Sequence, residues 1–265
     1  MPEEYNMAFN QRFMDIDGCR LNLRRGGSGA PLLYLHGASG APAVMPFMER
    51  LARHFDVLVP EHPGFGLSDE PAWLENIHDL AYFYLDLLRA LDLKDVHVVG
   101  SSLGGWLALE MAVRDTSRIG SLLLVGPAGI SVPGIQPGDI FLWPPEQLVR
   151  NLFFDQKLAE QRLAEPMTPE LLDMTLKNRH TVARLGWEPR LHDPFLPKWL
   201  HRIDVPVKIV WGEEDRILPV AYAREFGKLM PRAQVEVIPR CGHLPQAEKP
   251  DLFCDIVLRF AGAKG

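Results

Sequence analysis

Residues 99–105 read VGSSLGG, and this stretch decides how the rest of the sequence is interpreted. An apolar run at 96–99 precedes it, and from Leu103 onward apolar residues recur at the three- and four-residue spacing of a helix. A G-x-S-x-G pattern between a strand and a helix is typical of a tight turn that exposes its serine, with glycines that let the two elements approach. We therefore predict that Ser102 is a nucleophile. The plainer alternative is an ordinary Gly-Ser turn that opens a helix.

Five further apolar runs lie on both sides of this stretch, at 32–35, 57–59, 122–125, 207–211 and 235–238. Most of them do not alternate with polar residues, which is typical of strands buried on both faces of a parallel sheet. Helical patterns lie between several runs, at 80–91, 103–111 and 221–230. Near the N-terminus, two alternating runs flank Asp17-Gly18, a dipeptide that suits a two-residue hairpin turn. These patterns predict an α/β fold with a mostly parallel, doubly wound sheet and an N-terminal antiparallel hairpin.

The segment 127–200 interrupts the alternation of strands and helices. It holds 10 of the 23 prolines, no strand-like run, and short helical patches at 146–154 and 169–185. A structureless connection of this length is uncommon inside a compact domain. We predict that 127–200 forms a helical cap inserted into a core domain made of 1–126 and 201–265.

Composition and charge exclude several classes of function. A hydrophobic share of 47% and a charged share of 23% are those of a folded globular protein. The net charge of −6 provides no basic surface for phosphates, so we expect no nucleic-acid partner. The three cysteines show no CxxC spacing, so we expect neither a disulfide framework nor a zinc site.

The location in the cell is inferred from two further features. Residues 1–4 are acidic where an export signal is basic, and no apolar run reaches the length of a membrane span. We therefore expect a cytoplasmic protein that acts on a small molecule and has no membrane partner. The sequence leaves the oligomeric state open, a homodimer included.

A serine becomes a good nucleophile only beside a base, and the base needs an acid that orients it. His243 follows the last apolar run, and Asp215 follows the run at 207–211. Loops that follow parallel strands open at the same edge of the sheet, so Ser102, Asp215 and His243 are expected to meet there. Glu213 and Glu214 compete for the acid role, and we prefer Asp215 because its short side chain directly precedes the segment that leads into the next helix.

The oxyanion of an acyl-transfer intermediate needs two hydrogen-bond donors. We predict that one is the backbone N–H of Leu103, directly after the nucleophile, and that the other is the N–H of Ala38 in the loop at 36–40. In the same loop, His36 is interpreted as a structural anchor. Ser39 contacts either the substrate or its own loop.

Five motifs stand in the order of one known family: the loop beginning His36-Gly37, the segment 62–69, the turn at 100–105, the segment 212–215 and Gly242-His243. Over almost the whole chain they resemble the α/β-hydrolase superfamily, specifically its cap-bearing esterases, lactonases and C–C bond hydrolases. The resemblance implies the α/β-hydrolase fold and an acyl-enzyme on Ser102, with no metal and no organic cofactor. Dehalogenases and epoxide hydrolases of this fold use an aspartate nucleophile, which Ser102 argues against.

Within the family we expect an esterase or lactonase. The first alternative is a C–C bond hydrolase that cleaves a vinylogous diketone of the meta-cleavage type. That branch typically has Asn before the nucleophile and Trp after the histidine, where this chain has Ser101 and Leu244. It also has an Arg in the cap, for which Arg179, Arg184 and Arg190 are available. A non-catalytic small-molecule receptor on the same fold is an alternative of a different class.

The aromatic content of the cap predicts an apolar or aromatic substrate. The plainer interpretation of each ring is that it packs the cap onto the core. The predicted substrate contacts are Trp143, Phe153 and Trp187 in the cap, with Ser39 and Leu244 beside the catalytic residues.

Overall fold

The computed structural model describes residues 9–41 and 43–262; residues 1–4, on which the expected lack of an export signal rests, lie outside these ranges. The described residues form an eight-stranded sheet in the order β1-β2-β4-β3-β5-β6-β7-β8. β2 is antiparallel to both β1 and β4, and the other neighbours are parallel, which confirms the predicted mostly parallel sheet. The strands are β1 (Asn10–Ile16), β2 (Cys19–Gly27), β3 (Ala30–Leu35), β4 (Phe55–Pro60), β5 (Val96–Ser101), β6 (Ile119–Val125), β7 (Val207–Gly212) and β8 (Gln234–Ile238).

The predicted N-terminal hairpin is confirmed. Ile16 pairs with Cys19, so Asp17 and Gly18 alone make the turn. Their φ angles are 50° and 73°, and a two-residue turn with both φ values positive matches the right-handed twist of the flanking strands.

Burial explains why most of the apolar runs do not alternate. The last four residues of β3, β4, β5 and β7 are all buried, because helices cover both faces of the sheet there. β8 differs: Val235 and Val237 are 40% and 41% exposed. The interpretation of 235–238 as a strand buried on both faces is therefore wrong, since β8 lies at the edge of the sheet beside β7.

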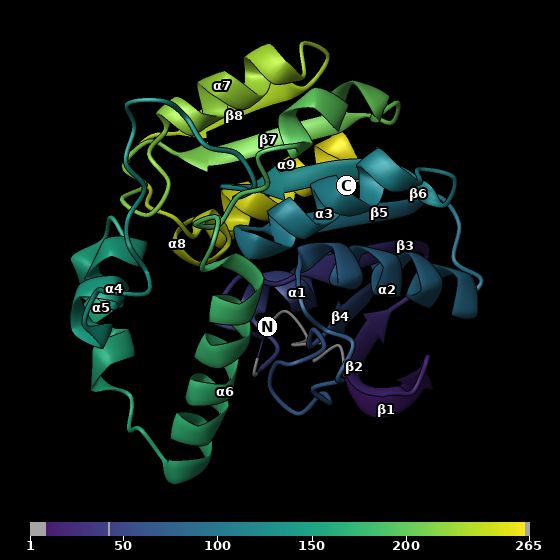
Figure 1. Ribbon diagram of the computed structural model, residues 1–265, viewed down its shortest axis with the longest axis horizontal. Helices are drawn as coiled ribbons and strands as arrows, with labels where there is room; N and C mark the ends of the chain where they lie inside the picture. The colour runs from purple at the N-terminus through teal and green to yellow at the C-terminus, as the bar shows by residue number, and fades with distance from the viewer. Residues whose placement is uncertain (1–8, 42, 263–265) are drawn as a thin grey trace, which may run out of the picture.

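Helices lie on both faces of the sheet, as the doubly wound pattern predicts. On one face, α2 (Ile77–Ala90), α3 (Leu103–Arg114) and α7 (Ala221–Leu229) contribute to the larger apolar cluster. On the other face, α1 (Pro46–Leu51) and α9 (Pro250–Phe260) contribute to the second cluster. Figure 1 shows α2 and α3 in front of the central strands and α9 behind them.

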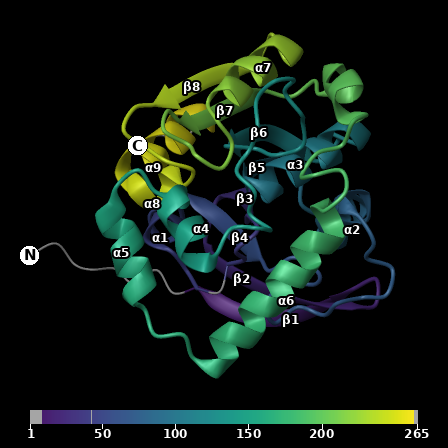
Figure 2. The same cartoon turned by 60° about the vertical axis from the view of Figure 1, so that its left-hand side comes forward.

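A helical insertion separates β6 from β7. It contains α4 (Pro145–Leu152), α5 (Gln156–Ala164), α6 (Pro169–Gly186) and the 3-10 helix η1 (Leu196–Arg202). In Figure 1, α4, α5 and α6 stand apart from the sheet on the left of the molecule, and in Figure 2, where this side comes forward, they lie in front of the sheet. Two of these helices lie where the helical patches predicted them, whereas α5 was not expected. Among the described residues, no helix combines the length and apolarity that a membrane crossing requires.

Candidate active site

The turn between β5 and α3 holds Ser102 in an uncommon backbone conformation, with φ 55° and ψ −113°. Close packing of backbone on backbone enforces it. A Cβ atom placed on Gly104 would lie 2.1 Å from the carbonyl oxygen of Leu35, and one on Gly100 would lie 2.4 Å from that of Gly104. Only glycine fits at these two positions, so the predicted sharp turn at Ser102 is present.

His243 and Asp215 meet, as the order of the loops predicts. His243 follows β8, Asp215 follows β7, and both side chains are buried. His243 Nδ1 lies 2.7 Å from Asp215 Oδ2, so Nδ1 carries the donated proton and Nε2 is left as the acceptor. The other carboxylate oxygen accepts the N–H groups of Ile217 and Leu218 at 2.8 and 2.9 Å, which orients the carboxylate.

The two other acidic candidates are placed elsewhere. Glu214 Oε2 accepts the N–H of Cys241 at 2.9 Å, and Glu213 is exposed. Asp215 is thus the carboxylate that contacts His243.

The end of β6 joins the two halves of this site. The N–H of Ser102 donates to the carbonyl of Val125 at 2.9 Å. At the next residue, a Cβ on Gly126 would lie 3.4 Å from both His243 Nδ1 and Asp215 Oδ2. Within the described residues, no hydrogen bond joins Ser102 Oγ to the ring of His243. Catalytic hydrogen bonds are often long in free enzymes and shorten when the substrate binds.

The predicted oxyanion donors lie beside Ser102. Leu103 is the first residue of α3, where backbone N–H groups have no partner within the helix. A Cβ on Gly37 would lie 3.3 Å from Ser102 Cβ, and the N–H of Gly40 donates to the carbonyl of Gly37 at 3.1 Å, which closes a tight turn around Ala38. The structure therefore brings both segments to the nucleophile, and the roles of Leu103 and Ala38 remain predictions.

Two buried histidines anchor the loop at 36–40. His36 Nδ1 donates to the carbonyl of Gly37, and its Nε2 accepts the N–H of His62. His62 Nε2 donates to the carbonyl of His36, and its Nδ1 accepts the hydroxyl of Tyr84. Both rings are thus neutral and each has one tautomer. Burial lowers the pKa of His36 to about 4, and burial together with the neighbouring His36 lowers the pKa of His62 well below its ordinary value.

The predicted substrate contacts occupy varied positions. Ser39 is exposed, Trp143 and Leu244 are half-buried, and Phe153 is buried. Trp187 is 48% exposed, and the guanidinium of Arg190 stacks 4.2 Å above its ring. None of these positions assigns a substrate contact by itself, so all five remain predictions.

Asn178, which no sequence pattern singled out, links the insertion to this site. Asn178 on α6 donates to the carbonyl of Ser39 at 3.1 Å and accepts the N–H of Gly66 at 2.9 Å. The side chain is 4% exposed and connects α6 to the predicted oxyanion loop. No local pattern marks this role, because the partners lie more than 100 residues away in the chain.

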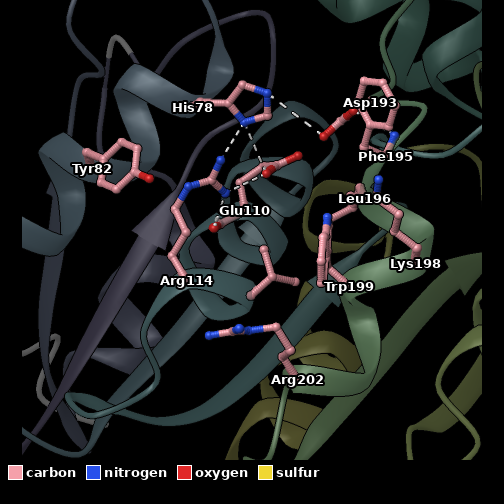
Figure 3. Close-up of a pocket in the computed structure, with 11 residues that line it drawn as sticks. His78, Tyr82, Glu110, Arg114, Asp193, Phe195, Leu196, Lys198, Trp199 and Arg202 are labelled. Carbon is pink, nitrogen blue, oxygen red and sulfur yellow. Dashed lines mark hydrogen bonds and ion pairs between the residues drawn. The ribbon is translucent and has the colours of Figure 1, made fainter.

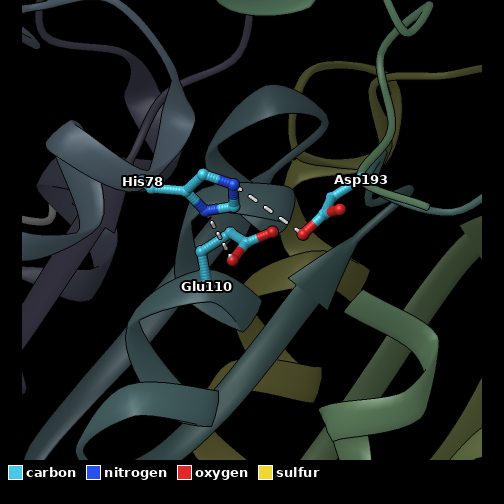
Figure 4. Close-up of side chains that lie close together, drawn as sticks. All are labelled: His78, Glu110 and Asp193. Carbon is cyan, nitrogen blue, oxygen red and sulfur yellow. Dashed lines mark ion pairs between the residues drawn. The ribbon is translucent and has the colours of Figure 1, made fainter. Parts of the chain in front are cut away.

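A separate pocket of about 560 Å³ lies along α2, α3 and η1 (Figure 3). His78, Glu110 and Asp193 converge there, with one potential ligand atom from each within 4.8 Å of the others (Figure 4). Arg114 already supplies the positive charge: Nη1 lies 2.6 Å from Glu110 Oε2, and Nη2 lies 2.6 Å from His78 Nδ1. A metal ion would have to displace this guanidinium, so we interpret the cluster as an ion-pair network.

Two observations support that interpretation. Burial alone would raise the pKa of Glu110, but hydrogen bonds from His78, Arg114 and Trp106 lower it, so the carboxylate is ionised beside Arg114. Glu110 also lies eight residues beyond Ser102, about 12 Å along α3. The cluster is therefore separate from Ser102.

Comparisons with known proteins agree with this geometry. Among curated proteins, the chain is 28% identical over 271 residues to a 2-hydroxymuconate semialdehyde hydrolase of Pseudomonas sp. (strain CF600), with 91% of this chain and 89% of the relative covered. It is also 28% identical over 281 residues to a 2-hydroxy-6-oxo-6-phenylhexa-2,4-dienoate hydrolase of Burkholderia cepacia, with 92% of each covered. Among solved structures, an esterase from Rhodococcus sp. ECU1013 superimposes with a TM-score of 0.79 at 20% identity, covering 98% of this chain and 100% of that chain.

The family model described as "Alpha/beta hydrolase family" matches residues 32–256, which include the turn at Ser102 as well as Asp215 and His243. The fold predicted from the five motifs is thereby confirmed. The chain belongs to the alpha/beta hydrolase family and is a hydrolase of that fold.

Proposed function

We propose that Ser102 attacks a carbonyl carbon, that His243 accepts the hydroxyl proton, and that Asp215 orients the imidazole. The buried 2.7 Å contact between His243 and Asp215 carries this proposal, because it leaves Nε2 as the proton acceptor on a loop beside the nucleophile. The N–H groups of Leu103 and Ala38 stabilise the oxyanion. The acyl group left on Ser102 is hydrolysed by a water molecule that His243 activates.

The proposed substrate is a vinylogous diketone cleaved at a C–C bond, which reverses the preference for an ester drawn from the sequence. Support comes from the curated relatives named for such substrates, which match about nine tenths of this chain and of their own length. Ser101 and Leu244 favour the ester, but they are two positions, whereas the similarity extends over both the core and the insertion.

The reaction balances with these residues. Attack by Ser102 forms a C–O bond, and collapse of the oxyanion breaks the adjacent C–C bond. This cleavage takes place in the diketo tautomer of the substrate, where the electron pair of the broken bond passes into the conjugated enone of the leaving fragment, and the resulting dienolate accepts the proton held by His243. Hydrolysis of the acyl-enzyme then consumes one water, so the products are a carboxylic acid and a dienol acid.

Among the three cap arginines, Arg190 has a buried donor that is not in use, and we propose that it binds the carboxylate of such a substrate. Its Nη2 lies 3.4 Å from Asp139 Oδ2, and its Nη1 is buried without a hydrogen-bond partner among the described residues. A substrate carboxylate would provide the missing acceptor. Arg184, in contrast, is occupied by Glu70, and Arg179 is exposed.

The substrate class is tested by assaying the wild type with 2-hydroxy-6-oxo-6-phenylhexa-2,4-dienoate and with 4-nitrophenyl butyrate. We expect the larger kcat/KM with the diketone, and a loss of about tenfold to a hundredfold in that value for Arg190→Gln, the cost of one charge-assisted contact. Arg179→Gln is the matched control and should behave as the wild type. A larger kcat/KM with the ester would instead support ester hydrolysis, the second candidate.

Nucleophilic chemistry itself is tested independently of the substrate. A fluorophosphonate should label the wild type with one equivalent and should not label Ser102→Ala. A wild type that fails to react would overturn the catalytic proposal and favour the receptor alternative.

A further inference from the structure

The corner between α4 and α5 contacts the loop that carries His243. The carbonyl of Leu152, the last residue of α4, accepts the backbone N–H of His243 at 2.8 Å. Next to this bond, the carboxylate of Glu248 joins the same two segments. We propose that Glu248 is a positioning residue that holds the His243 loop against the insertion, so that the base is in place only while the α4–α5 corner is seated.

Each oxygen of Glu248 serves one side of this junction. Oε1 accepts the N–H of Gly242, the residue before the histidine, at 2.6 Å. Oε2 accepts the N–H groups of Phe154 and Asp155 at 3.0 Å each, just before the first turn of α5. A carboxylate is suited to this task, because it has two acceptor oxygens and its charge is favourable at a helix N-terminus.

The junction is packed without room for a side chain at position 242. A Cβ on Gly242 would lie 2.6 Å from the carbonyl oxygen of Leu152 and 2.8 Å from Glu248 Oε1. On the opposite side, a Cβ on Gly212 would lie 1.9 Å from the carbonyl oxygen of Gly242. The loop is therefore clamped between the insertion and the end of β7.

This arrangement divides the support of His243 between two parts of the protein. Asp215 holds the ring from the core. Leu152 of the insertion accepts the backbone N–H of His243 itself, and Glu248, the last residue of α8 (Pro245–Glu248), accepts that of Gly242 before it and ties this loop to the insertion. Loss of the Glu248 bridge would leave the Asp215 contact possible but would free the backbone that aims the ring. Displacement of a catalytic group by about 1 Å is enough to reduce a rate by about a hundredfold.

Glu248→Gln tests the inference with little change in volume. A glutamine keeps one acceptor oxygen, but its NH2 group would face the N–H donors of either Gly242 or α5, so one side of the bridge is lost. We expect kcat and the rate constant of fluorophosphonate labelling to fall about tenfold to a hundredfold, with KM changed by less than about threefold. The imidazole N–H resonance of His243 in proton NMR spectra should move or broaden, which a loss of stability alone would not cause.

Glu165→Gln is the matched control. It makes the same acid-to-amide change just after the far end of α5, where Glu165 pairs with Arg162, and it leaves the Glu248 bridge intact. It should leave labelling at the wild-type rate, because ion pairs between exposed side chains contribute little.

The inference rests on the proposed catalytic roles, and the labelling assay separates the two. A wild type that is not labelled overturns those roles and this inference with them. If the wild type is labelled and Glu248→Gln reacts at the same rate, the positioning role alone is wrong. Should Glu248→Gln fail to fold, hydrogen exchange in the wild type decides: slow exchange at Gly242, Phe154 and Asp155 supports the bridge, and rapid exchange overturns it.

Discussion

The paired histidines beneath the predicted oxyanion loop predict a specific loss of stability in acid. His36 is 1% exposed, and burial lowers its pKa in the folded protein to about 4, against 6.5 for a free imidazole. Below pH 6.5 the unfolded chain binds a proton that the folded protein excludes. The contribution of His36 to stability is therefore complete above pH 6.5 and is lost as the pH falls from 6.5 toward 4.

The size of the effect follows from the two pKa values. Between about pH 7 and about pH 5, His36 alone should lower the free energy of unfolding by about 2 kcal/mol. His62 acts in the same direction, because its pKa is lowered too. Urea unfolding of the wild type at both pH values measures the total, which also includes every other titrating group.

A variant isolates the share of His36. His36→Gln keeps an acceptor in reach of the N–H of His62 but does not titrate, so its loss of stability between the two pH values should be about 2 kcal/mol smaller than that of the wild type. His201→Gln, at an exposed position on η1, is the control and should retain the wild-type difference. A His36→Gln protein that loses as much stability in acid as the wild type would refute the neutral, buried state of His36.

Three other predictions use the contacts of single residues. Asp215→Asn should lower kcat by about three to four orders of magnitude with little change in unfolding temperature, because an amide cannot hold the His243 tautomer; retained turnover in a steady-state assay would contradict this role. Asn178→Ala should lower the free energy of unfolding in urea by about 1–3 kcal/mol, since it leaves two backbone groups unpaired, and unchanged stability would show that this bridge contributes nothing. Gly18→Ala should lower the free energy of unfolding by about 1 kcal/mol, because only its φ of +73° opposes a side chain. Gly104→Ala should lower it several times more, because the new Cβ meets a backbone oxygen at 2.1 Å, and equal shifts in the unfolding temperatures would refute the close packing at the turn.

Most of the fold could be predicted because burial leaves a local pattern in the sequence. Strands covered on both faces read as continuous apolar runs, and the helices on those faces show their own spacing. The exposed edge at β8 could not be recognised in this way, because a strand's position in the sheet depends on which neighbours it pairs with. α5 was missed for a related reason: apart from Ala159, its residues are not buried, so no apolar face marks it.

The candidate site was predictable where chain order decides it. Ser102, Asp215 and His243 each follow a strand of one sheet, so a shared edge could be inferred. The residues that support them could not be found in this way. Asn178 and Glu248 bind backbone groups about 90 or more positions away, and no spacing rule connects a side chain to a backbone N–H at that separation.

The choice of substrate shows a different difficulty. Ser101 and Leu244 adjoin the proposed catalytic residues, and these two neighbours weaken the diketone interpretation without excluding it. Such neighbours adjust a site whose reaction depends on the nucleophile, the base and the shape of the pocket. The proposal of a diketone rests on a broader observation, the similarity to curated relatives over about nine tenths of this chain.

The turn at Ser102 fixes where the side chain of residue 102 lies, whichever residue occupies that position. Its shape is maintained by backbone atoms of β3, β5 and α3 that meet across Gly100 and Gly104, and not by the serine side chain. The glycines are therefore the fixed part of the turn, and position 102 is the exchangeable part. Replacement of Ser102 by Cys or Asp would therefore change the side chain that the turn exposes and leave the backbone of the turn in place.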